Sequence, residues 1–507
     1  MTSDQTTFNY IKAIEEAKVY DVAVKTPLNH APKLSARLDN HILLKREDLQ
    51  PVFSFKLRGA YNKIANLSDE EKAKGVICAS AGNHAQGVAM SAQKLGIAAT
   101  IVMPETTPDI KISAVDAMGA NVVLIGDSYS DALVHAEVLC NENGYTFIHP
   151  YDNELVIAGQ GTVAKELLAQ SNKDMDAVFI PIGGGGLAAG MAIYLKAKSP
   201  HTKLIGVEPV DSAAMFASIQ ANQLVTLDQV GIFADGVAVK QVGDITFDLC
   251  RQYLDEIILV DTDETCAAIK DIYDEIRAVV EPAGALALAA MKKYVNRENI
   301  SGQTLVAINS GANMNFDRLR HVSERAELGE RREALFTVEI PEKAGSFLDF
   351  CNHLGAYNVT EFNYRMCSRN KAYVYVGVAI KHGAQAEQIT QELHGLGYNI
   401  TSLMDNEAAK LHLRHLVGGK SVDVQNEHLY RFEFPERPRA LLDFLTKLAG
   451  RWNISLFHYR NHGAAFGRVL VGFEVPDSDI SDFHTFLDDV GYTYVDESDN
   501  QALKLFL

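Results

Sequence analysis

The sequence of 507 residues has few of the features that mark secreted, membrane-bound or nucleic-acid-binding proteins. Its six cysteines are widely scattered and show no paired metal spacing. It contains no run of about 18 apolar residues, and its start lacks the basic-then-apolar pattern of a signal peptide. The formal net charge of −18 disfavours nucleic acid or an anionic membrane as a partner. These absences predict a soluble, reduced, cytoplasmic protein.

Lys56 has an unusual setting, because the stretch Phe53–Ala60 surrounds it with aromatic and aliphatic residues. Burial disfavours the ammonium form and lowers the pKa, which leaves a nucleophilic amine that can form a Schiff base with an aldehyde. The alternative interpretation is an ordinary surface lysine, which is far more common. Two further segments favour the reactive amine.

The first segment is a run of four glycines, Gly183–Gly186. It follows an apolar run that is typical of a strand, Val178–Ile182, and precedes a run of helical character, Ala188–Lys196. Backbone amides in such a loop, together with a helix start, favour a bound phosphate. A flexible linker is the alternative, although linkers seldom lie between a strand and a helix. Neither common nucleotide-binding motif fits the spacing.

The second segment is the small polar turn Ala79–Gly87, which follows the apolar residues Gly75–Cys78. The helix start expected after the turn offers amides that could bind a carboxylate, and Asn83 offers a side-chain donor. Alone the turn is only suggestive, because small residues and asparagine are ordinary turn formers. Together with a Schiff-base lysine and a phosphate loop, it predicts a pyridoxal phosphate site.

Five motifs occur in the order seen in fold type II pyridoxal phosphate enzymes: Ser54–Gly59, Ser80–His84, Gly183–Gly186, Glu281–Ala285 and Ser310–Asn313. The whole chain, tail included, resembles the biosynthetic threonine dehydratases of this group. The alternation of apolar runs with helical stretches up to about residue 320 agrees with parallel sheets covered by helices. The resemblance implies an α/β catalytic domain of two subdomains with the cofactor between them, followed by two α+β ACT-like regulatory domains.

The resemblance also implies roles for individual residues. Lys56 would hold the cofactor and then remove the α-proton, and Asn83 would hydrogen-bond its 3′-oxygen. Ser310 would face the pyridine nitrogen, and a neutral hydroxyl there favours elimination over transamination. The remaining cofactor contacts would be Phe55, Gly183, Gly184, Gly185, Gly186 and Leu187. The substrate would be bound by Ser80, Ala81, Gly82, Asn83, His84, Gly236 and Glu281, although Glu281 is equally well interpreted as a helix cap.

The expected activity is that of a threonine ammonia-lyase, which converts L-threonine to 2-oxobutanoate and ammonia in the first step of isoleucine biosynthesis. L-Serine, one methyl shorter, should be a poorer substrate by only ~1–3 kcal/mol of discrimination. The resemblance further implies isoleucine as feedback inhibitor, valine as its antagonist, and a homotetramer.

Three alternatives stay open. A racemase of the same fold would need a serine immediately before Gly82, where this chain has Ala81. Related racemases also hold a divalent metal beside the strand that ends at Glu208, but one expected carboxylate position is Ala214, so we expect no metal. A β-replacement synthase is disfavoured by the doubled tail. A non-catalytic amino-acid sensor is disfavoured because Lys56 is retained.

The tail consists of two similar segments. Residues 339–342 (EIPE) return as 433–436 (EFPE), and residues 358–365 return as 453–460. We expect a catalytic domain over 1–320, a charged connector with a solvated helical face over 321–333, and ACT-like domains over 334–418 and 427–507, each with a ββαββα order. A purely structural or oligomer-forming module is the alternative. Gly345 in the first copy predicts an effector site there, because the second copy has Arg439 at that turn.

Overall fold

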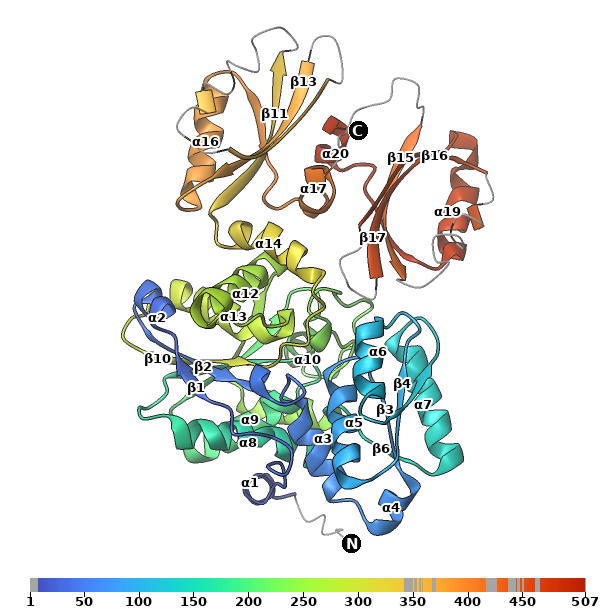
Figure 1. Cartoon of the computed structure of the whole chain (residues 1–507). Helices are drawn as coiled ribbons and strands as arrows, with labels where there is room; N and C mark the ends of the chain where they lie inside the picture. The colour runs from blue at the N-terminus through green and yellow to red at the C-terminus, as the bar shows by residue number, and fades with distance from the viewer. Residues whose placement is uncertain are drawn as a thin grey trace. The chain divides into compact units, whose positions relative to one another are not determined.

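The computed structural model describes residues 8–341, 350, 353–354, 357, 359–366, 371–415, 426–435, 444, 447–448, 451–460 and 466–506. The chain divides into two compact units, Met1–Val322 and Ser323–Leu507 (Figure 1). Within the described ranges, every helix is too short or too polar to cross a membrane. The predicted effector residue Gly345 and its counterpart Arg439 lie outside the described residues.

The first unit is built on a six-stranded sheet with the order β1-β2-β10-β7-β8-β9. Strand β1 is antiparallel to β2, and the other described neighbours are parallel, as predicted from the sequence. In β7, Phe179 belongs to one hydrophobic cluster, whereas its neighbours Val178 and Ile180 belong to another. Both faces of the sheet are therefore buried. The strands are β1 (Leu28–His30), β2 (His41–Arg46), β7 (Ala177–Pro181), β8 (Lys203–Pro209), β9 (Glu256–Val260) and β10 (Thr304–Asn309).

A second, four-stranded parallel sheet with the order β5-β4-β3-β6 completes this unit. Its strands are β3 (Val76–Ala79), β4 (Ala99–Met103), β5 (Asn121–Leu124) and β6 (Thr146–Phe147). The helices of the unit are α1 (Tyr10–Glu15), α2 (Pro32–Leu38), α3 (Lys56–Ala65), α4 (Asp69–Lys74), α5 (Asn83–Leu95), α6 (Asp109–Asp116), α7 (Tyr129–Asn143), α8 (Glu154–Gln170), α9 (Gly186–Lys198), α10 (Ala214–Ala221), α11 (Asp244–Tyr253), α12 (Thr262–Ile276) and α13 (Pro282–Glu298), with 3-10 turns η1 (Glu47–Leu49) and η2 (Asp235–Val237).

The second unit contains two antiparallel four-stranded sheets of matching order, β12-β13-β11-β14 and β16-β17-β15-β18. Both sheets carry a register shift at the corresponding place, Val359/Glu361 and Ile454/Leu456. The repeat seen in the sequence is therefore also a repeat in structure. The first half has β11 (Glu333–Pro341), β12 (Val359–Met366), β13 (Lys371–Ala379), α16 (Ala384–Gly395) and β14 (Asn399–Ser402), followed by α17 (Glu407–Leu411) and η3 (Leu413–His415). The second has β15 (Glu427–Pro435), β16 (Asn453–Arg460), β17 (Phe466–Glu474), η4 (Asp477–Asp479), α19 (Ile480–Val490), β18 (Thr493–Asp496) and α20 (Gln501–Phe506).

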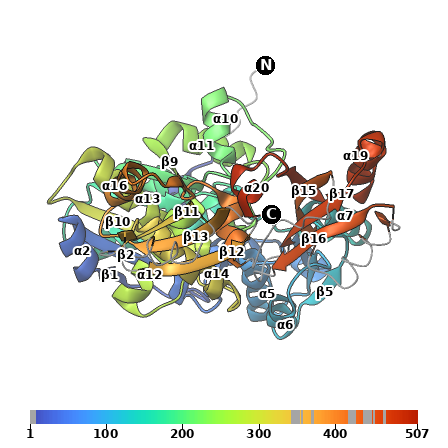
Figure 2. The ribbon, with the colours of Figure 1, turned by 90° about the horizontal axis from the view of Figure 1, so that it is seen from above.

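The expected ββαββα order is wrong for the described residues. In each half, adjacent strands such as β12 and β13 are followed by a helix and then by one last strand, and the strands form a single sheet. Helix α19 lies along one face of its sheet (Figures 1 and 2), where Phe483 and Phe486 pack against Phe473, which in turn packs against Phe432. The α+β class of the prediction is confirmed.

The charged connector also differs from its prediction. It is helical as expected, since α14 (Arg318–Gly329) covers most of it. However, Arg325 is only 2% exposed and pairs with Glu407 at 2.6 Å, and Glu333 pairs with Arg414 at 3.0 Å. Two of the connector's charges, at Arg325 and Glu333, are therefore paired in the interior, whereas Arg331 and Arg332 are exposed as the prediction expected. A count of charged residues could not make this distinction.

Candidate active site

The predicted site residues lie where parallel strands of the first unit end. The turn 80–82 joins β3 to α5, the glycine loop joins β7 to α9, and Ser310 follows β10. The carboxyl ends of the strands in an α/β sheet are the usual place for a ligand. Residues far apart in the sequence are thereby brought to one location.

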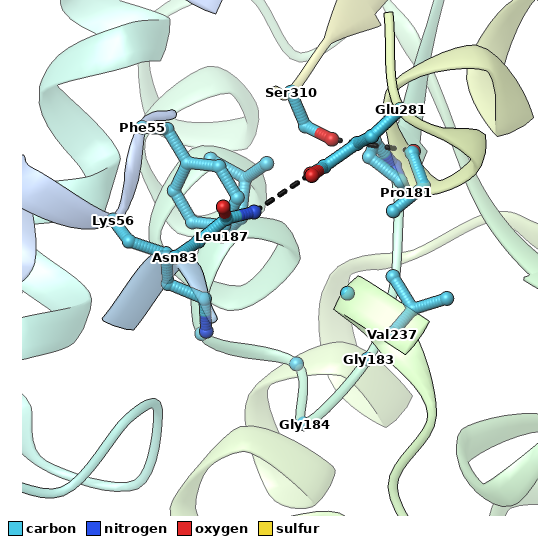
Figure 3. A pocket seen from close by; sticks show the side chains of 14 residues that line it. Phe55, Lys56, Asn83, Pro181, Gly183, Gly184, Leu187, Val237, Glu281 and Ser310 are labelled. Atoms are coloured by element: carbon cyan, nitrogen blue, oxygen red, sulfur yellow. Dashed lines mark hydrogen bonds between the residues drawn. The ribbon is translucent and has the colours of Figure 1, made fainter. Parts of the chain in front are cut away.

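One pocket collects most of the predicted residues (Figure 3). Its lining comprises Phe55, Lys56, Asn83, Gly183, Gly184, Gly185, Gly186, Leu187, Gly236, Glu281 and Ser310, together with Pro181, Val237 and Ala283, which the sequence did not single out. Four residues predicted to bind substrate are not part of the lining: Ser80, Ala81, Gly82 and His84.

Lys56 is the first residue of α3, and its Nζ donates a hydrogen bond to the carbonyl oxygen of Pro150 at 3.1 Å. Burial lowers the pKa of this amine to about 8, an effect that the charge of Glu281 opposes. Roughly a tenth of the amine is therefore neutral and nucleophilic at pH 7, and about half at pH 8, far more than for an ordinary lysine.

The glycine loop is tightly packed. A Cβ atom added at Gly184 would lie 2.1 Å from the ring of Tyr151, and one at Gly185 would lie 2.8 Å from the side chains of Met215 and Thr246. Gly185 also has a φ of +95°, which side-chain-bearing residues rarely adopt. It precedes α9 without any side-chain cap, so the free amides of the helix start are available to an anion.

The first turn of α11 and the turn 149–153, which the sequence did not single out, hold the glycine loop in place. Thr246 Oγ1 donates to the carbonyl of Gly184 at 2.6 Å. Asp152 in turn accepts the first backbone N–H groups of α11 from residues 244, 245 and 246 at 3.0 to 3.2 Å. The only sequence signal was the short polar and aromatic turn 149–153 between β6 and α8.

Glu281 is a buried carboxyl group that faces Asn83 across the pocket. Asn83 Nδ2 donates to its Oε1 at 2.7 Å, as Figure 3 shows. Burial, followed by the charge of Asp235, raises the pKa of Glu281 to about 7, although the bond from Asn83 lowers it. Ser310 Oγ is 3.2 Å from the carbonyl of Ala283, to which it donates. The pocket thus combines an amine, an amide, a carboxyl group and a hydroxyl group.

The turn before α5 is arranged differently. His84 is buried and its Nε2 lies 2.7 Å from the carbonyl oxygen of Ile148, while burial and the charge of Lys56 lower its pKa to about 3. The methyl group of Ala81 packs against the hydrophobic cluster of the smaller sheet. Ser80 Oγ accepts the backbone N–H of Gly82 at 3.3 Å. In this turn the side chains stabilise the loop, and the uncapped backbone amides at the start of α5, those of Asn83 and His84, are left to contact a ligand.

Comparison with known proteins agrees with this site. Residues 19–311 match the family described as pyridoxal-phosphate dependent enzyme, and residues 324–413 and 418–507 each match the C-terminal regulatory domain of threonine dehydratase. The biosynthetic L-threonine dehydratase of Burkholderia multivorans is 55% identical over 98% of this chain and 99% of its own length. The chain belongs to the biosynthetic threonine dehydratase family.

Other members of the family are similarly close. The Escherichia coli enzyme is 54% identical over 98% of this chain and 97% of its own length. The Solanum lycopersicum threonine dehydratase 1 is 50% identical over 100% of this chain and 84% of its own length. Among solved structures, the processed form of threonine deaminase isoform 2 from Solanum lycopersicum has 51% identity and a TM-score of 0.62, with coverage of 62% of this chain and 92% of that one. Maize serine racemase has 32% identity and a TM-score of 0.58, with coverage of 62% of this chain and 96% of the racemase chain.

The residues present fit the cofactor of the family, pyridoxal phosphate. The crowded glycine cradle suits a phosphate, and Lys56 supplies a buried amine with a lowered pKa. Glu208, at the end of β8, has a different role. Its two oxygens accept the N–H groups of Met215 and Phe216 at 2.9 and 2.8 Å, and burial raises its pKa to about 8. It therefore caps the first turn of α10 as a largely neutral group.

Proposed function

We propose that this protein converts L-threonine to 2-oxobutanoate and ammonia, as a biosynthetic threonine ammonia-lyase, with L-serine as a poorer substrate. Water is lost in the elimination and taken up again in the hydrolysis that releases ammonia, so the net products are 2-oxobutanoate and ammonia. The observation that carries this proposal is the position of the Lys56 amine in one pocket with the glycine cradle and Ser310. Membership of the dehydratase family supplies the reaction class.

Bound pyridoxal phosphate would supply the electron sink that stabilises negative charge at the α-carbon of the substrate. Residues Gly183 to Leu187 would hold its phosphate through backbone amides, and Phe55 would pack beside it. Asn83 would donate to its 3′-oxygen. Ser310 would meet its pyridine nitrogen with a neutral hydroxyl group, which favours elimination over transamination.

Lys56 would act as the base at the α-carbon of the substrate once the amino acid has taken its place on the cofactor. Its pKa of about 8 suits a group that must both gain and release a proton near neutral pH. The turn Ser80 to His84 would bind the carboxylate of the substrate, through the uncapped backbone amides at the start of α5, with Gly236 and Glu281 completing its surroundings. The lowered pKa of His84 keeps its ring neutral, which fits a scaffold role.

The second unit supports a regulatory proposal. We assign feedback inhibition by isoleucine, with valine as antagonist, to its two repeated halves. A site at Gly345 in the first half stays a prediction. A homotetramer in the cytoplasm and the domain limits 1–320, 321–333, 334–418 and 427–507 belong to the same proposal. Inhibition requires that isoleucine bind one global state of the enzyme better than another.

A threonine saturation curve tests activity and regulation together. Purified protein loaded with pyridoxal phosphate should form 2-oxobutanoate and ammonia in equal amounts, and isoleucine should shift the curve. Lys56→Ala should abolish turnover, because it removes the amine and the base at once. Steady 2-oxobutanoate formation by the pure variant, above that of the cofactor in solution, would refute the assignment of Lys56.

A further inference from the structure

Asn313 ends the motif that begins at Ser310, and none of the roles above uses its side chain. Its Nδ2 donates to two oxygens, the backbone carbonyl of Val52 at 2.8 Å and the side-chain Oδ1 of Asn83 at 2.7 Å. One amide group thus joins three places in the chain: the loop after β10, the segment that precedes Lys56, and the first residue of α5.

The carbonyl of Val52 fixes the direction of this hydrogen-bond chain. A backbone carbonyl can only accept, so the Asn313 atom that faces it must be the NH₂ nitrogen. The same nitrogen faces Asn83, so the facing atom of Asn83 must be its carbonyl oxygen. The NH₂ group of Asn83 is thereby left to face the pocket, where it donates to Glu281.

Val52 is itself held in place. The segments 52–55 and 310–313 are joined by backbone hydrogen bonds from Ala312 N to Phe53 O at 2.9 Å and from Phe55 N to Ser310 O at 3.2 Å. A β-bridge links Ser54 to Gly311 between them. The acceptor that orients Asn313 therefore belongs to the backbone scaffold, directly before Lys56.

We propose that Asn313 is a positioning residue that makes Asn83 a hydrogen-bond donor toward the pocket, and so lets Asn83 recognise the 3′-oxygen of pyridoxal phosphate. This inference rests on the proposed function, in which Asn83 contacts that oxygen. If Asn83 were turned over, its NH₂ group would face that of Asn313 and its carbonyl oxygen would face the cofactor oxygen, so a donor would oppose a donor and an acceptor an acceptor. The orientation of one amide thus decides whether the site attracts or repels an oxyanion.

Asn313→Asp tests the proposal, because a carboxylate of the same shape can accept but cannot donate. The side chain of Asn83 should turn over to donate to the introduced carboxylate, and its oxygen should then face the pocket. We expect roughly a 10- to 100-fold weaker affinity of the protein for pyridoxal phosphate, measured by fluorescence titration. The pKa of the bound cofactor, followed through the pH dependence of its absorption band, should rise, because the cofactor oxyanion has lost a hydrogen-bond donor.

Asn315→Asp is the matched control, since it places the same charge in the same loop. Asn315 Oδ1 only accepts, from the backbone N–H of Asp317 at 3.3 Å, and an aspartate can do the same. Its affinity for the cofactor and its absorption band should match those of the wild type. A change as large as that of Asn313→Asp would mean that loop charge alone acts, and would overturn the proposal.

A double-mutant cycle distinguishes positioning from a structural role. Asn313→Asp should have no further effect on the absorption band in an Asn83→Ala background, because the oriented amide is gone. Equal effects in both backgrounds would contradict the inference. If Asn313→Asp does not fold, Asn313→Ala should show an intermediate loss of affinity, and wild-type affinity in that variant would refute the proposal. Failure of the wild-type protein to bind the cofactor would instead refute the proposed function.

Discussion

The two strand-to-helix turns of the catalytic unit differ in the room that they leave around their glycines. At Gly184 a Cβ atom would overlap the ring of Tyr151 at 2.1 Å, whereas at Gly82 no described atom lies within 4 Å of such a Cβ. The glycine loop is also held by Thr246 of another helix, while the turn at Gly82 is held by side chains of the turn itself, Ser80 and His84. A crowded, braced loop suits a permanent phosphate, and an open one suits a substrate that must enter and leave.

Gly184→Ala should show the difference between the two turns most strongly. The added methyl group must displace Tyr151 or move the loop, and either change misplaces the amides that we propose to bind the phosphate. We expect roughly a 10- to 100-fold loss of affinity for pyridoxal phosphate by fluorescence titration. The matched change in the open turn, Gly82→Ala, should leave that affinity within about twofold and change the KM for threonine instead. Equal losses in both variants would remove the distinction between the loops.

Thr246→Val should show how much the hydrogen bond from Thr246 to the glycine loop contributes to stability and cofactor binding. It removes the hydroxyl group that donates to the Gly184 carbonyl, in a side chain that is fully buried. We expect ~1–3 kcal/mol of lost stability, seen in urea unfolding of the cofactor-free protein, together with weaker cofactor binding. Thr226→Val is the control, because its hydroxyl group is exposed and bonds only to Gln241 among the described contacts. A Thr246→Val protein as stable as this control would show that this hydrogen bond is dispensable.

The pH dependence of cofactor uptake should report the environment of Lys56. Only the neutral amine attacks an aldehyde, and the pKa of Lys56 is lowered to about 8 by burial. The rate at which the cofactor-free protein takes up pyridoxal phosphate should therefore rise with pH and level off above about 8. A rate that still climbs toward about pH 10, as for an ordinary lysine, would contradict the lowered pKa.

Glu281→Gln sharpens that measurement. The negative charge of Glu281 raises the pKa of Lys56, so its removal should move the midpoint of the uptake curve to lower pH. A midpoint that stays in place, or moves upward, would show that Glu281 does not act on the amine in this way.

Ala81→Ser should have the smallest effect, because the methyl group of Ala81 packs on the hydrophobic cluster of the smaller sheet and not in the pocket lining. The wild type should eliminate but barely racemise, and the serine variant should behave in the same way. Chiral analysis of serine after partial turnover is the measurement. D-serine that forms about as fast as pyruvate would show that residue 81 reaches the substrate.

The sequence predicted those parts of the site whose residues are contiguous in the chain. An apolar strand, four glycines and a helix specify the phosphate loop by themselves, and β7 and α9 lie where the pattern placed them. Lys56 was found because a charged residue contrasts with its apolar neighbours.

The rest of the site depends on contacts between distant segments. Thr246 meets Gly184, and Asn313 meets Val52, only because the fold places these loops together. Thr246 lies in the first turn of α11 and Asn313 in the loop after β10, and the sequence neighbours of neither residue indicate its partner. His84 shows the converse, since its motif suggested a ligand contact while its ring is committed to a carbonyl of the scaffold.

Chemical trapping is the most direct test of whether Lys56 carries the cofactor. Protein loaded with pyridoxal phosphate should be reduced with borohydride, digested and analysed by mass spectrometry. If Lys56 holds the cofactor, the reduced cofactor mass should be found on the peptide that contains Lys56, and threonine added before reduction should lower this yield. Cofactor mass on another lysine, with Lys56 unmodified, would contradict that role.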